Sequence, residues 1–120
     1  MEQLSDNYMD NVRRFDEVLG VGRSCDMISR DLRIGGRRAR IWVVDGFGGD
    51  AVLERMGSFW LALAPEDVGV LTEMQTFINR FVTFMEANAS IKREDIVTSV
   101  LLGNTLLLME RVQAADLIDC

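Results

Sequence analysis

The sequence contains no histidine, which removes the side chain that most often serves as a general base or metal ligand near neutral pH. It has only two cysteines, Cys25 and Cys120, and their separation matches no zinc-ligand spacing. Cys25 also lacks a histidine that could activate it as a nucleophile. These absences disfavour an enzyme, and we expect no catalytic residue, no cofactor and no metal site.

Long hydrophobic runs and an excess of basic charge are also missing. The most apolar stretch, residues 97–109, is interrupted by polar residues and a glycine and falls short of the ~20 residues that a membrane-spanning helix needs. Thirteen basic residues stand against 19 acidic ones, a net charge of -6, which disfavours nucleic acid as a partner. We therefore predict a single soluble domain over residues 1–120, located in the cytosol. Because Cys120 ends the sequence within an apolar run, we expect the chain to be a fragment of a longer protein.

Apolar periodicity in the first part of the chain changes from helical to alternating. Spacings of three and four predict an amphipathic helix within residues 1–18. Alternation predicts a strand over 26–34, and Gly35-Gly36 suits the tight turn into a second, antiparallel strand over 40–44. Three arginines lie beside this turn, and we interpret them as a solvated hairpin tip rather than a binding patch: Arg37, Arg38 and Arg40.

The remainder of the chain is predicted to be helical first and then to form a second hairpin. Pro65 separates the first helix from the second, and Ser90 or a neighbour caps the third. The predicted helices cover about 50–64, 66–87 and 90–102, and the predicted strands cover 105–109 and 114–120. The fold class is therefore α+β, with a small, mostly antiparallel sheet from two hairpins packed against three to four helices.

Two features of the first third invite a functional interpretation. Arg30 is in phase with apolar Ile28 and Leu32, so it either lies near a sheet edge with its head in water or pairs with a carboxylate or carbonyl. The Gly46–Gly49 stretch follows a strand and precedes a helix, but it lacks the lysine and the spacing of a phosphate-binding loop. Asp45 is explained as a turn residue. The residues alone therefore support a small α/β domain without an evident active site.

The order of these short motifs carries a family resemblance. Residues 19–30 contain the motif Ser-x-Asp-apolar-apolar-x-Arg, in which Asp26 and Arg30 are the charged positions, and residues 41–47 contain the motif apolar-Asp-Gly, here Val44-Asp45-Gly46. Together they resemble the N-terminal soluble region of the GerA family of spore germination proteins, and are most similar to its stage V sporulation AF-type members. The tail, residues 101–109 and 114–118, is similar to two further strands of that family.

The resemblance implies a role that is not enzymatic. Family members are A-type subunits of germinant receptor assemblies in the spore inner membrane, or relatives of them, and this chain resembles only their first N-terminal soluble subdomain. It implies a cytosolic assembly or signal-transmission module on the cytoplasmic face of that membrane. Its partners would be other subunits of the receptor or channel assembly, with homo-oligomerisation left open, and the full-length protein would be in the membrane.

The resemblance also marks candidate interaction positions: Asp26, Arg30, Asp45 and Gly46. Hairpin geometry and a strand-to-helix corner explain them more simply than a ligand does. The alternative hypothesis is that the domain senses a small molecule, a germinant or a nucleotide, near the Val-Asp-Gly corner.

Overall fold

The computed structural model describes six segments of the chain. They are residues 4–22, 27–44, 57–69, 73–81, 86–112 and 114–119. These segments hold the helices α1 (Tyr8–Val18), α3 (Ser58–Leu61), α4 (Pro65–Val68), α5 (Met74–Phe81) and α6 (Arg93–Leu101), and the strands β1 (Met27–Ile34), β2 (Arg37–Val44), β3 (Glu86–Ser90), β4 (Thr105–Met109) and β5 (Ala115–Asp119).

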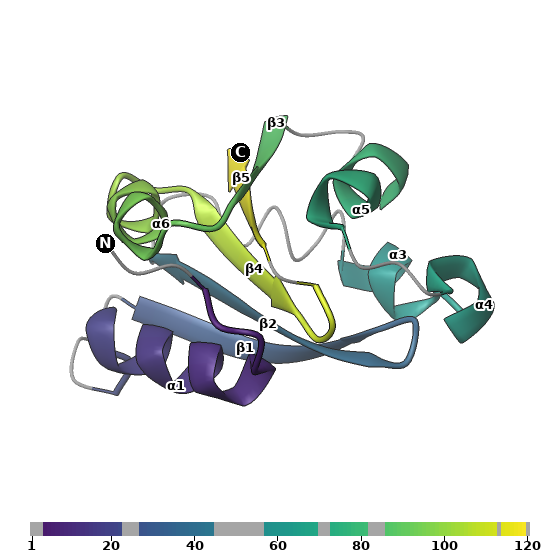
Figure 1. The fold of residues 1–120 in the computed structure, drawn as a ribbon, viewed down its shortest axis with the longest axis horizontal. Helices are drawn as coiled ribbons and strands as arrows, with labels where there is room; N and C mark the ends of the chain where they lie inside the picture. Colours follow the sequence, from purple (N-terminus) through teal and green to yellow (C-terminus); the bar gives the residue numbers. More distant parts are fainter. Residues whose placement is uncertain are drawn as a thin grey trace.

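The strands form one antiparallel sheet in the order β1-β2-β4-β5-β3 (Figure 1). The β1–β2 and β4–β5 hairpins are the two that the sequence predicts, and pairing of β2 with β4 joins them into a single sheet. Five helices in the described segments accompany this sheet. The predicted α+β class with a small antiparallel sheet is therefore confirmed.

The β1–β2 hairpin turns tightly at Gly35 and Gly36, which both have positive φ, 57° and 81°. Glycine adopts this region without the steric penalty of a side chain. A Cβ atom at Gly35 would in addition collide with the side chain of Val68, so the turn packs closely against α4. β2 begins at Arg37, three residues before its predicted start, because pairing with β1 continues up to the turn.

One prediction for the middle of the chain is wrong. The helix predicted over 66–87 is divided, since α4 ends at Val68 before Gly69 with φ 59°, α5 follows as a separate helix, and Glu86–Ser90 form β3. Ser90 itself lies in that strand, and the N-cap residue of α6 is its near neighbour Lys92. Pairing of β3 with β5 is a contact between distant segments, and it overrides the local helical pattern.

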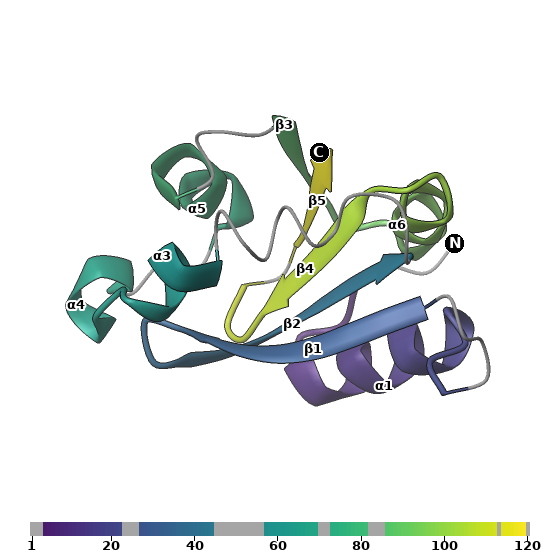
Figure 2. The ribbon, with the colours of Figure 1, turned by 180° about the vertical axis from the view of Figure 1, so that it is seen from behind.

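The sheet has helices on both of its faces, which gives three layers (Figures 1 and 2). On one face, the apolar side chains of α1 and α6 pack against Trp42, Leu106 and Leu108. On the other face, α3, α4 and α5 pack against Ile41 and Leu107 and their neighbours. Central strand β4 is buried along its whole length because both of its faces are covered.

Candidate binding groove between α1 and the β1–β2 hairpin

Alternation along β2 directs Arg38, Arg40 and Trp42 to the face that α1 covers. Trp42 is fully buried, and its ring lies 5.8 Å from that of Phe15 in α1, centroid to centroid. Its indole Nε1 donates a hydrogen bond of 2.9 Å to Oδ1 of Asp16. A buried indole N–H requires a partner, so Asp16 fixes how α1 sits on the sheet.

Arg40 connects the same aspartate to the neighbouring strand. Its Nη2 donates to Asp16 Oδ1 at 3.1 Å, and its Nη1 donates to Asp31 Oδ1 at 2.9 Å. The guanidinium carbon lies 5.7 Å from the centre of the Trp42 ring. One arginine therefore joins α1, β1 and β2, with only 18% of its side chain exposed.

Arg38 makes the second charged connection, from β2 to the end of β4. Its Nε and Nη2 donate to Glu110 Oε2 at 3.1 and 2.9 Å, while its backbone N–H donates to Glu110 Oε1 at 3.1 Å. These bonds, the backbone one first, hold the pKa of Glu110 below its ordinary value. The guanidinium carbon of Arg38 also lies 5.3 Å from the centre of the Tyr8 ring.

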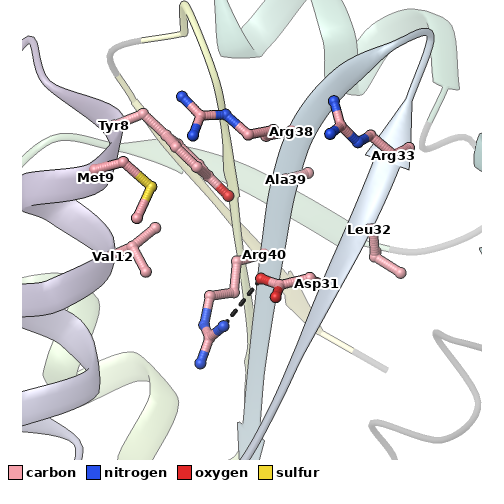
Figure 3. Close-up of a pocket in the computed structure, with 9 residues that line it drawn as sticks. All are labelled: Tyr8, Met9, Val12, Asp31, Leu32, Arg33, Arg38, Ala39 and Arg40. Carbon is pink, nitrogen blue, oxygen red and sulfur yellow. Dashed lines mark hydrogen bonds and ion pairs between the residues drawn. The ribbon is translucent and has the colours of Figure 1, made fainter.

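Between these contacts lies an open groove of about 310 Å³. Helix α1 contributes Tyr8, Met9 and Val12, and the hairpin contributes residues 31–33 and 38–40, as Figure 3 shows. Burial raises the pKa of Tyr8 to about 12, and the Asp31 carboxylate adds to the shift. The Tyr8 phenol is therefore neutral at physiological pH.

The groove combines hydrogen-bond donors, one carboxylate and an apolar wall. Three arginines and one aspartate are among its described lining residues, together with the exposed Met9 and the buried Val12. Such a combination can bind a small molecule by charge and by apolar contact at once. It lies on the opposite side of the hairpin from the apolar face that carries Ile34.

Of the four predicted site residues, the structure describes only Arg30, which does not line this groove. Arg30 is exposed in β1, which is the first strand of the sheet order, and this agrees with the alternative in which its head reaches water. Asp26, Asp45 and Gly46 lie outside the described residues, so the predicted Asp-Gly corner stays a prediction.

The interpretation of the hairpin arginines as a solvated tip is wrong. Arg37 is only 5% exposed and donates to the carbonyl of Gly69 at 2.9 Å, while Arg38 and Arg40 form the ion pairs described above. Gly69, Glu110 and Asp16 lie in distant segments, and the local sequence cannot reveal such pairs. The groove residue Tyr8 was missed for the same reason, whereas Asp31 pairs with Arg40 within the hairpin once the register is known.

Two further findings concern the described segments. They contain no cluster of three or more side chains suited to hold a metal ion. No helix in them combines the length and the apolarity needed to cross a membrane.

Comparison with known proteins finds a match in structure but none in sequence. No protein-family model matches the chain, and no curated protein matches it. Among solved structures, the fold is similar to the N-terminal domain of the A subunit of the Bacillus megaterium spore germinant receptor GerK3, with a TM-score of 0.76 and 16% identity. The match covers 98% of this chain and 48% of that one, so the chain spans about half the length of the solved domain. The resemblance drawn from the motifs is thus confirmed at the level of the fold.

Proposed function

We propose that this chain is an N-terminal domain of an A-type subunit of a spore germination receptor, and that it acts in assembly or signal transmission. The observation that carries the proposal is the likeness in fold to the A-subunit domain of GerK3 over 98% of the chain. The motifs around Asp26, Arg30 and Asp45 also support it, because they resemble those of the same family in sequence.

The proposal includes a location and a class of partner. The domain would correspond to the first subdomain of a longer subunit and would work on the cytoplasmic face of the spore inner membrane, in contact with other subunits of the assembly. It would be a non-enzymatic module. The ion pairs that join α1, β1, β2 and the end of β4 suit such a role, because they hold the elements in one arrangement without chemical turnover.

Disruption of the gene in the source organism tests this proposal. We expect spores to form in normal number and with normal heat resistance, but to lose their refractility much more slowly after nutrient is added. Complementation with the intact gene should restore the response. Complementation with Trp42→Ala, which removes a fully buried side chain, should fail to restore it.

The matched control for that variant is Arg13→Ala. The Arg13 side chain is 68% exposed and pairs only locally with Asp10, so this variant should fold and should restore germination. Unchanged nutrient germination after gene disruption, or an organism that forms no spores, would overturn the proposed function. Co-purification of the tagged full-length protein with other receptor subunits would test the partner class directly.

A further inference from the structure

Two arginines face one another in the wall of the groove. Arg33 of β1 and Arg38 of β2 are direct partners in the register of the hairpin, on the face that α1 covers. Like charges directly opposite one another destabilise a strand pair unless an anion compensates them. This pair therefore calls for a source of negative charge.

Among the described residues, a carboxylate pairs with only one of these two arginines. Arg38 is held by both carboxylate oxygens of Glu110. Arg40, next along the strand, is compensated by Asp16 and Asp31. In the described part of the chain, the guanidinium of Arg33 makes only a long hydrogen bond of 3.4 Å to the carbonyl of Gly36. One guanidinium of the groove is thus left with donors for an external anion.

A third donor faces the arginines from the helix. Tyr8 extends from α1 toward the hairpin, with Arg38 beside its ring (Figure 3). Its hydroxyl makes no hydrogen bond to any of the residues that the structure describes. A neutral phenol beside the Arg38 guanidinium can donate to a carboxylate or phosphate oxygen.

On the side of α1, the groove is apolar beyond Tyr8. Met9 is 37% exposed although it is a large hydrophobic side chain, and the buried Val12 lies below it (Figure 3). A volume of about 310 Å³ lies at the lower end of the range for sites that bind small molecules. The groove therefore suits a compact molecule that carries an anionic group next to a short apolar part.

We propose that this groove binds a small organic anion, with its carboxylate or phosphate held by Arg33, Arg38 and the Tyr8 hydroxyl and its apolar part against Met9 and Val12. The proposal does not depend on a role in germination. A carboxylate and a phosphate share the chemistry that these donors recognise, and the experiment distinguishes between them.

The test uses probes with one apolar chain and different head groups. The purified 120-residue chain is titrated with hexanoate, hexyl phosphate, hexanol, hexylamine and inorganic phosphate, and amide chemical shifts are followed by NMR. We expect hexanoate or hexyl phosphate, or both, to bind at least about tenfold more tightly than hexanol and hexylamine, because hydrogen bonds to charged groups contribute to the anions alone. The shifts should be concentrated at Tyr8, Arg33 and Arg38. The anion that binds more tightly shows whether the site prefers a carboxylate or a phosphate. The affinity for inorganic phosphate measures the contribution of the arginine pair without an apolar contact.

Two variants and a matched control complete the experiment. Arg33→Gln should weaken anion binding about tenfold or more while leaving hexanol unchanged, and Tyr8→Phe should weaken it less, since the ring under Arg38 is kept. Arg30→Gln removes an equally exposed arginine from the opposite face of the same strand and should have no effect. Equal affinities for hexanoate and hexanol, shifts located elsewhere, or equal losses in the two arginine variants would each overturn the proposal.

Discussion

Replacement of Asp16 by alanine should destabilise the fold more than its partly exposed position suggests. The Asp16 side chain is 31% exposed, and an exposed carboxylate ordinarily contributes little to stability. Here one oxygen, Oδ1, accepts from the indole of Trp42 at 2.9 Å and from Arg40 at 3.1 Å. Removal of the carboxylate leaves a fully buried indole N–H without its acceptor.

The expected magnitude follows from the groups that lose their partners. A buried donor left unsatisfied costs about 1–3 kcal/mol, and loss of the partly exposed ion pair with Arg40 adds up to about 1 kcal/mol. We therefore expect Asp16→Ala to lower the free energy of unfolding by about 2–3 kcal/mol. For a chain of this length that is a fall in Tm of about 8–12 °C, taking about 4 °C for each kcal/mol. Asp16→Asn keeps an acceptor for Trp42 and should cost about half as much.

Urea unfolding followed by tryptophan fluorescence measures these differences, with unchanged m-values as the check on two-state behaviour. The matched control is Asp10→Ala, on the same helix, where the carboxylate pairs only with exposed Arg13. We expect that control to cost about 0.5 kcal/mol. If Asp16→Ala costs no more than Asp10→Ala, the hydrogen bond to Trp42 does not hold α1 to the sheet and the reasoning is refuted.

Three further predictions concern titration and the hairpin turn. Tyr8 is the sole tyrosine, so absorbance of the folded chain at 295 nm should show a midpoint near pH 12, and a midpoint near 10 would contradict its burial against the hairpin. Folding lowers the pKa of Glu110, so the ionised carboxylate stabilises the fold fully at pH 7, and this stabilisation is lost as the pH falls through the pKa of the folded state, which lies below 4.5. The free energies of unfolding of wild type and Glu110→Gln, measured in urea, should therefore differ at pH 7 and converge at pH 2. Gly35→Ala should lower the free energy of unfolding by at least about 2 kcal/mol, because its Cβ meets Val68. Gly22→Ala, also at positive φ but with open space around it, should lower it by about 1 kcal/mol. Equal losses for the two variants in thermal unfolding would mean that the turn does not pack against α4.

The elements that the sequence predicts best are those whose signals are local. Alternation along residues 27–34 and the glycine pair at the turn specify the first hairpin, since both depend on neighbouring residues only. Pro65 likewise marks the start of α4. The error over residues 66–87 has two origins. The helix α4 ends before Gly69, whose φ is 59°, and from Glu86 the chain forms β3, which exists through its pairing with β5 about 30 residues further along. A helical pattern cannot report pairing with a distant strand.

The groove could not be predicted, because most of its charged contacts join segments that are far apart in sequence. Arg38 and Glu110 are 72 residues apart, and Asp16 and Trp42 are 26 apart. What the sequence does show is a run of arginines beside a Gly-Gly turn, which is equally compatible with a solvated tip. Whether these arginines are solvated or paired with carboxylates depends on the register of β1 on β2 and on the position of α1.

Once the pairs are assigned, the arginines of the hairpin separate into two kinds. Arg37 is buried, Arg40 is largely buried, and both donate to protein acceptors, so they serve the fold. Arg33 lies on the same face of the sheet as Arg40, with a single long hydrogen bond to the described residues and opposite another positive charge. A fold that needed only stability would gain from a neutral side chain at this position, because the cross-strand repulsion would vanish. Arg33 is thus the residue at which the requirements of folding and of binding diverge, and its replacement by glutamine should stabilise the free domain slightly while it removes the anion site.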